Sequence, residues 1–173
     1  MSFLVRKITM SRWPRNKYKG LSDISADTLT NVLNTKNNEL SFWKAENEEE
    51  IKEIGASFFS RLNGAQSYIS LVAIPYEELE NISNLKNSPK HGDTAIPKLK
   101  IKHYDLCNLT SESLCATADA IAKRTSNLDL NQIIDLDKDE AITVLQKMLT
   151  DGEVDKSLLG DFMKGELLNQ HNG

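Results

Sequence analysis

The residues of this chain best suited to bind a charged ligand are concentrated near its start. Residues 12–20 read RWPRNKYKG, and residues 1–22 hold six lysines and arginines and no acidic residue. Cations bind phosphate groups and aromatic rings stack on bases, so the pattern is typical of a segment that binds nucleic acid or an acidic protein surface. The contact residues that we expect are Arg12, Trp13, Arg15, Lys17, Tyr18 and Lys19. An ordinary structural interpretation also fits, in which the cations are solvated and Trp13 packs on the core.

A second group of reactive residue types lies further along the chain. His103, Cys107 and Cys115 could ligate a metal, with His91 or Asp105 as a fourth ligand, but their spacings match no zinc module. A histidine and a cysteine of this group could form a nucleophile and base pair, but the sequence identifies no residue that would orient it. Two buried thiols and a core histidine explain the same residues, so we predict no metal site and no cofactor.

Other motifs that could bind a ligand or support catalysis are incomplete or absent. Asp135, Asp137 and Asp139 resemble the start of a calcium loop, but its sixth and twelfth positions hold Glu140 and Gln146 instead of glycine and glutamate. The sequence contains neither a glycine-rich phosphate loop nor a Gly-x-Ser-x-Gly nucleophile motif. We therefore expect the chain not to be an enzyme.

The elements that must position these residues are organised around residues 39–75. Leu40 to Ala45 is predicted to form a strand, and Tyr68 to Ile74 a second strand that is buried on both faces. Between them, Asn47 and Glu50 predict a capping box at the start of a helix. A helix between two strands predicts a parallel pair joined by a right-handed crossover.

The predicted helix has a single apolar face, formed by Ile51, Ile54, Gly55, Phe58 and Leu62, with Phe59 widening it. Asn63 and Gly64 are predicted to end it. Ser2 to Ile8 is predicted to be a strand as well, and Tyr76 to Glu80 a single helical turn.

The segments that follow are predicted to be a long loop and an edge strand. Residues 81–97 hold two prolines and few apolar residues, so we expect an irregular loop that would be the lid if the chain were an enzyme. Lys98 to Tyr104 alternates lysine with apolar residues, a pattern that predicts an edge strand.

The C-terminal part is predicted to be helical and to end in an αα-hairpin. Thr110, Asp137 and Asp155 are its predicted N-caps, the second in a capping box with Glu140. The last helix carries bulky apolar residues that could bind a partner or pack on the chain itself. The predicted interface residues are Leu158, Leu159, Phe162 and Met163.

The fold class that we predict is α+β, or α/β, with a small mixed sheet that contains the parallel unit of residues 39–75. Residues 1–104 would form the core with its basic arm, and residues 105–173 an acidic helical portion that could pack with it as one domain. The 173 residues carry a net charge of −4, and residues 105–173 hold thirteen acids against six bases.

Two cysteines and no apolar run of membrane-spanning length lead us to expect a reduced, cytoplasmic protein that does not enter a membrane. The opposed charges and the missing catalytic motifs favour a non-catalytic interaction protein. We expect an accessory subunit of a larger multi-protein complex, and that complex could act on nucleic acid. The alternative is an immunity-type or antitoxin-type inhibitor with an acidic binding surface, and a small enzyme is the least favoured interpretation.

Overall fold

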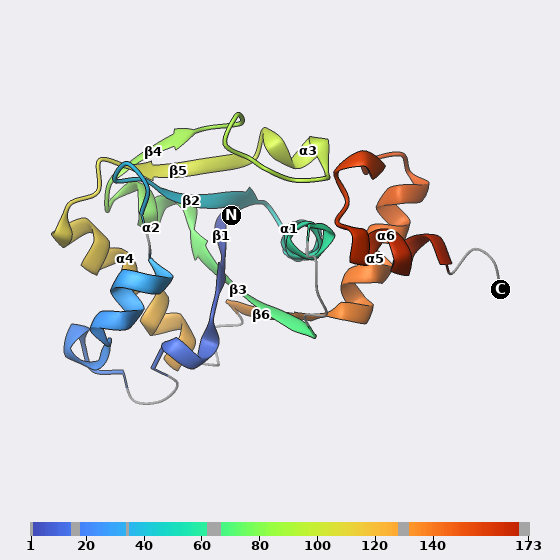
Figure 1. The fold of residues 1–173 in the computed structure, drawn as a ribbon. Coiled ribbons are helices and arrows are strands. Elements are labelled where there is room, and N and C mark those ends of the chain that lie inside the picture. Colours follow the sequence, from blue (N-terminus) through green and yellow to red (C-terminus); the bar gives the residue numbers. More distant parts are fainter. Residues whose placement is uncertain (1, 15–17, 34, 62–66, 128–131, 170–173) are drawn as a thin grey trace.

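The computed structural model describes residues 2–14, 18–33, 35–61, 67–127 and 132–169. Within these ranges the chain forms an α+β fold in which a sheet of six strands lies between two layers of helices (Figure 1). The strand order is β4-β5-β2-β1-β3-β6. The strands are β1 (Phe3–Ile8), β2 (Leu40–Ala45), β3 (Tyr68–Pro75), β4 (Asn84–Asn87), β5 (His103–Cys107) and β6 (Ile133–Asp137).

All neighbouring strands of this sheet pair antiparallel, so the predicted parallel pair is wrong. β2 and β3 do run in the same direction, but β1 lies between them and pairs antiparallel with both. The connection between β2 and β3 therefore crosses over β1. Leu4 and Val5 on β1 are fully buried and belong to the apolar clusters on opposite faces of the sheet. Burial on both faces is expected for a strand in the interior of a covered sheet.

The helix of this crossover, α1 (Glu48–Ser60), begins where the sequence predicts. The Asn47 side chain accepts a hydrogen bond from the backbone N–H of Glu50 at 2.9 Å. The Glu50 carboxylate accepts from the N–H of Glu46 rather than of Asn47, so the return bond of the predicted capping box lies one residue earlier. The predicted stop at Asn63 and Gly64 lies outside the described residues.

The helices divide between the two faces of the sheet (Figure 1). One apolar cluster joins β1, β2 and β3 to α1, α5 (Lys138–Thr150) and α6 (Asp161–Asn169). The second joins the other face to α2 (Tyr76–Glu80), α4 (Ser111–Ser126) and the short helices near the N-terminus. The short helices near the N-terminus are the 3₁₀ turns η1 (Met10–Arg12) and η2 (Leu21–Asp23) and the π-type turn η3 (Thr28–Val32). Two further short helical segments lie later in the chain, α3 (Pro97–Lys100) and the 3₁₀ turn η5 (Lys156–Leu158).

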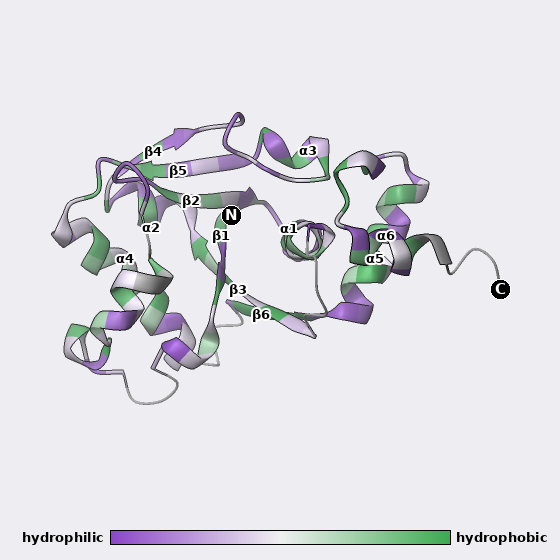
Figure 2. Ribbon diagram, in the orientation of Figure 1, coloured by the Kyte–Doolittle hydropathy of each residue, from purple (hydrophilic) through white to green (hydrophobic). Residues whose placement is uncertain are grey.

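The segment between α2 and β5 differs from the prediction. Residues 81–97 are not structureless, because β4 forms within them and pairs with β5. The predicted edge strand at Lys98 to Tyr104 is wrong as well. Pro97 opens the helical turn α3, since proline fits the first position of a helix, and β5 begins only at His103. β5 is an interior strand between β4 and β2, and β4 is mostly hydrophilic, as expected for an edge (Figure 2).

The C-terminal part contains one strand that the sequence analysis missed. β6 precedes α5 and pairs with β3, so residues 133–137 complete the sheet. The helix predicted from the N-cap Thr110 and the capping box predicted at Asp137 are both present. Thr110 also forms a capping box, with Ser113, which was not predicted. The helix predicted from Asp155 is interrupted: Asp155 caps the turn η5, and α6 begins at Asp161. None of the described helices combines the length and apolar character that crossing a membrane requires.

Candidate functional site

The basic segment near the N-terminus uses its aromatic residues inside the fold. Trp13 is 4% exposed and belongs to the cluster beneath α4. The Tyr18 hydroxyl donates a hydrogen bond of 2.6 Å to Asp119 on α4, and burial together with this carboxylate raises the tyrosine pKa. Arg12 and Lys19 are exposed, whereas Arg15 and Lys17 lie outside the described residues. Nucleic-acid binding by this segment stays a prediction that rests on its cations.

The apolar residues predicted as an interface also contact the chain's own core. Leu159 and Met163 are buried, and Leu158 and Phe162 are partly buried against the same cluster. The Lys138 ammonium lies 5.7 Å from the centre of the Phe162 ring. A partner would reach Leu158 and Phe162 without a rearrangement of α6, but not the other two side chains.

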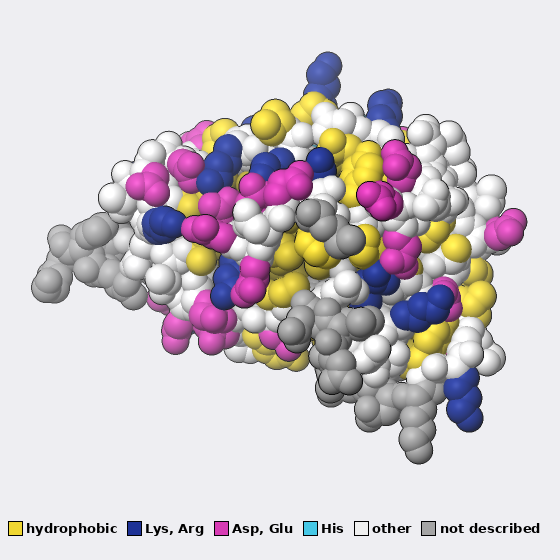
Figure 3. All heavy atoms as spheres, turned by 180° about the vertical axis from the view of Figure 1, so that it is seen from behind, with side chains coloured by type: hydrophobic (Ala, Val, Ile, Leu, Met, Phe, Trp, Pro, Cys, Tyr) yellow, Lys and Arg dark blue, Asp and Glu magenta, His cyan; other side chains and the backbone are white. Residues whose placement is uncertain are grey.

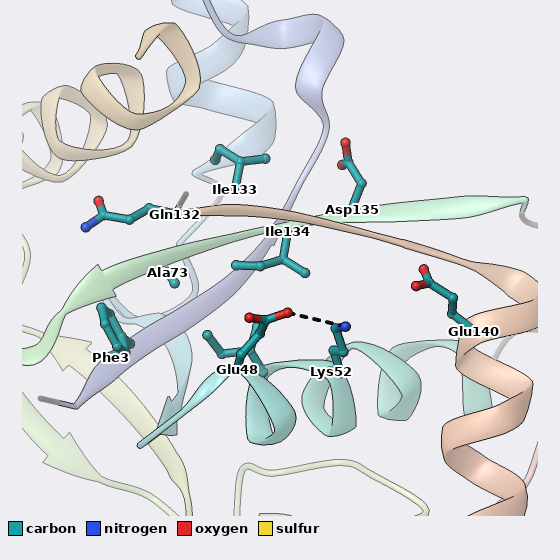
Figure 4. Close-up of a pocket in the computed structure, with 10 residues that line it drawn as sticks. Phe3, Glu48, Lys52, Ala73, Gln132, Ile133, Ile134, Asp135 and Glu140 are labelled. Atoms are coloured by element: carbon teal, nitrogen blue, oxygen red, sulfur yellow. Dashed lines mark ion pairs between the residues drawn. The ribbon is translucent and has the colours of Figure 1, made fainter. Parts of the chain in front are cut away.

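A recess in the surface, which we call the edge groove, lies where α1 faces β6. Its volume is about 500 Å³. The first turns of α1 form one wall, β6 the other, and Glu140 at the start of α5 closes one end (Figure 4). Ile134 points toward α1, whereas Ile133 and Asp135 point to the other side of the strand (Figure 4). The lining residues are Phe3, Glu48, Ile51, Lys52, Ala73, Gln132, Ile133, Ile134, Asp135 and Glu140.

The edge groove has an apolar floor and an acidic rim. Glu48 and Glu140 supply two carboxylates on the α1 side, against the ammonium of Lys52 among the described lining residues. Asp135 also lines the groove, but its carboxylate points to the other side of β6 (Figure 4). Lys52 already pairs with Glu48 at 3.3 Å, so the rim keeps a negative charge. Asp135 accepts a hydrogen bond from Ser70 across the β3–β6 ladder. More generally, acidic side chains with cations among them cover the half of the molecule that carries α5 and α6, as seen from behind in Figure 3.

β6 leaves one side of its backbone without a neighbouring strand. In the described part of the chain it pairs with β3 alone. Ile133 and Ile134 on this strand are only half-buried. An edge strand with accessible apolar side chains readily pairs with another chain, and natural proteins usually protect such edges. The edge groove therefore combines an open strand, apolar contacts and negative charge.

A separate polar site, which we call the Asp105 cluster, consists of Glu39, Ser41, His91, His103 and Asp105. It lies where β2 and β5 pair, since Ser41 is directly opposite Asp105. Asp105 is 1% exposed, and its carboxylate accepts hydrogen bonds from Ser41 at 2.8 Å and from His91 at 2.7 Å. One oxygen or nitrogen each of Glu39, His91 and Asp105 lies within 4.8 Å of the others.

The second histidine of this cluster is fully internal. His103 is 3% exposed, and its Nδ1 donates to the Ser88 carbonyl oxygen at 3.1 Å. Burial lowers the pKa of His103, although the nearby Asp105 opposes that effect. Its ring packs edge-on against Trp43 with the ring centres 4.9 Å apart. His103 is thus a buried core residue that lies beside Asp105, with its Nδ1 4.0 Å from Oδ1 of that carboxylate.

The two cysteines are free and lie in different places. Cys107 follows Asp105 on the same face of β5, and its Sγ lies 3.6 Å from Glu39 Oε1. Burial and the carboxylate of Glu39 raise the pKa of this thiol. Cys115 is on α4, which packs against the opposite face of the sheet. The structure thus gathers His91, His103, Asp105 and Cys107 and leaves Cys115 apart.

Sequence reasoning missed the edge groove and the place of Glu39 for identifiable reasons, although it had considered His91, His103, Asp105 and Cys107 together. The edge groove depends on β6, whose five residues IIDLD were assigned to a helical region. The alternation of apolar and acidic residues in this segment is a signal that could have found the strand. Glu39 gave no signal at all, because it joins the Asp105 cluster only through the pairing of β2 with β5.

Comparison with other proteins adds no further constraint on these sites. The chain matches no protein-family model, no curated protein and no solved structure.

Proposed function

We propose that this chain is a non-catalytic interaction protein that acts as an accessory subunit of a larger protein. The observation that carries the proposal is the edge groove, where an open strand lies beside an acidic rim. Strand addition supplies affinity through backbone hydrogen bonds, and pockets for alternate side chains supply specificity. The segment that fits is an extended stretch of the partner in which basic and apolar residues alternate.

A foreign basic segment fits this edge better than a second copy of the chain. Antiparallel pairing of two β6 strands would bring Asp135 and Asp137 close to the same residues of the other copy. Like charges on paired strands destabilise a sheet, whereas opposite charges contribute about 0.2–1 kcal/mol per pair. Charge complementarity therefore favours a basic partner.

The same observation supports a second candidate function. An inhibitor of the immunity or antitoxin type would use the acidic rim to cover a basic site on its target, and electrostatic attraction would speed its association. A role next to nucleic acid would add the exposed Arg12 and Lys19, which lie on a different part of the chain. The identity of the captured partner separates these functions.

The proposal is tested first with a probe of defined chemistry. A peptide that alternates lysine and valine is titrated into isotope-labelled protein, and backbone amide shifts are followed by NMR. We expect the largest shifts in residues 132–136, and weaker binding at higher salt because the attraction is screened. A matched peptide that alternates glutamate and valine should leave these shifts unchanged.

Charge variants then identify the partner in cells that contain the protein. The double variant Glu48→Gln/Asp135→Asn, which we call the rim variant, removes one charge from each side of the edge groove, on α1 and on β6. As a control, Glu77→Gln/Glu80→Gln removes two exposed charges on α2. The partner is the protein that wild type and control capture and the rim variant loses. Equal capture by all three, together with peptide shifts outside the edge groove, would overturn the proposed function.

A further inference from the structure

We propose that Glu39, His91 and Asp105 form a binding site for a divalent transition-metal ion, with Zn²⁺ as the fitting member of that class. The three residues come from separate segments. Glu39 immediately precedes β2, His91 lies in the loop between β4 and α3, and Asp105 lies in the middle of β5. Their ligand atoms already lie within 4.8 Å of one another.

Asp105 is the fixed part of the site. A buried carboxylate is costly unless it is paired and hydrogen-bonded. The Asp105 carboxylate is 1% exposed, and it accepts hydrogen bonds from Ser41 at 2.8 Å and from His91 at 2.7 Å. Its position is therefore fixed from two sides. A buried anion that keeps one accessible partner is the arrangement a metal cation requires.

His91 is that accessible partner. The His91 side chain is 58% exposed, and its Nδ1 lies 2.7 Å from Asp105 Oδ2. Two ligands of one tetrahedral zinc ion, each about 2.0–2.2 Å from it, lie about 3.3–3.6 Å apart. The distance between His91 Nδ1 and Asp105 Oδ2 therefore needs to increase by less than an ångström for an ion to bind between them in place of the shared proton. The ligand atoms of all three residues lie within 4.8 Å of one another. Glu39 is only half-buried, so rotation of its side chain can bring its carboxylate to the same ion.

The ligand types select the class of ion. Calcium and magnesium prefer sites made of oxygen atoms, whereas an imidazole nitrogen favours zinc and its neighbours. The Cys107 thiol beside Glu39 is a further soft donor within reach of the same carboxylate. Ser41 donates a hydrogen bond of 2.8 Å to the Asp105 carboxylate, as outer-shell residues of metal sites orient their ligands.

A bound ion would fix the loop of residues 88–96 to the sheet. This loop is already held by a two-bond ion pair between Arg61 on the α1 side and Asp93, at 2.7 and 3.0 Å, and by the hydrogen bond between His91 and Asp105. The ion would strengthen the second of these attachments by replacing the hydrogen bond with metal–ligand bonds. We therefore expect metal binding to raise the thermal stability of the chain as well as to be measurable directly.

The experiment is a calorimetric titration of Zn²⁺ into chelator-treated protein, paired with thermal unfolding. We expect a single ion per chain, micromolar or tighter binding, and a higher Tm with zinc. His91→Ala and Glu39→Gln alter accessible side chains, so both variants should fold, and each should weaken binding by at least about 100-fold, the upper range for outer-shell losses. Glu80→Gln, an exposed acid on α2, is the matched control and should bind like wild type.

Absorption of the Co²⁺-substituted protein reports the ligand set, because a thiolate ligand adds an intense charge-transfer band. A band in wild type that is lost in Cys107→Ser would support the proposal and identify Cys107 as a fourth ligand. Zinc affinity that is unchanged within threefold in His91→Ala or Glu39→Gln would overturn it. Binding only at millimolar zinc, with no change in Tm, would overturn it equally.

Discussion

Phe58 and Phe59 are neighbours on α1 that differ sharply in burial, so they form a matched pair for measuring the contribution of the core. Phe59 is 0% exposed and lies inside the cluster shared by α1, β3 and α5. Phe58 is half-buried at the edge of that cluster, with its ring centre 6.4 Å from that of Trp43. Replacement by alanine changes helix propensity equally at both positions, so the difference in stability reports burial.

The expected magnitudes follow from these surroundings. Phe59→Ala removes a fully buried ring and leaves a cavity, which should lower the free energy of unfolding by about 3–5 kcal/mol. Phe58→Ala removes a partly solvated ring and one edge-to-face contact, and should cost only about 1–2 kcal/mol. In a chain of this size the larger loss corresponds to a fall in Tm of about 6–20 °C.

The assay is equilibrium unfolding in urea, followed in parallel by far-ultraviolet circular dichroism and tryptophan fluorescence. Coincident transitions would establish that each variant unfolds in a single step, which the comparison of free energies requires. A loss for Phe58→Ala as large as that for Phe59→Ala would refute the reasoning, because the burial difference between the two rings would then carry no energetic weight.

Three further predictions concern the core and the charged groups. Gly55→Val should lower the free energy of unfolding by about 1–3 kcal/mol, because a Cβ at this position would lie 2.8 Å from Leu136 Cδ2 in the packed core. Urea unfolding that is unchanged from wild type would contradict this packing. Folding lowers the pKa of Asp105, so its carboxylate stabilises the fold above its unfolded pKa and that contribution is lost as the pH falls through the lower folded value. Acid titrations of Tm should therefore show a weaker decline below about pH 4 for Asp105→Asn than for wild type, and parallel curves would argue against this role. Glu78→Ala should lower the free energy of unfolding by about 1.5–3 kcal/mol, because it removes the carboxylate that accepts two hydrogen bonds from the buried Arg124. As the control, Glu49→Ala removes an exposed ion pair with Lys147 and should leave urea unfolding unchanged.

Local interactions explain which parts of the fold could be predicted from the sequence. The start of α1 at Asn47 and that of α5 at Asp137 depend on caps within four residues, and both appear where expected. The strand β3 was recognisable because its apolar residues are buried on both faces of the sheet. In each case the determining contacts are close in sequence or are implied by a local pattern of hydrophobicity.

Pairing between distant segments explains the errors. The lysine alternation of residues 98–102 resembles an edge strand, but Pro97 begins a helical turn there and the burial of Leu99 fixes it. The place of β1 between β2 and β3 depends on long-range pairing, which no local pattern encodes. The same holds for β6, whose partner β3 lies more than fifty residues away in the sequence.

The sequence by itself determined that the fold combines helices and strands, where the main helices are capped and what charge the N-terminal segment carries. These features depend on residue types and short spacings. Only the tertiary structure decided that Trp13 and Tyr18 serve the fold, that β6 borders an acidic groove, and that Glu39, His91 and Asp105 meet. The physical reason is that strand register sets which side chains face each other. The pairing of Ser41 with Asp105 brings Ser41 and the nearby Glu39 to a buried carboxylate, which His91 contacts from its loop.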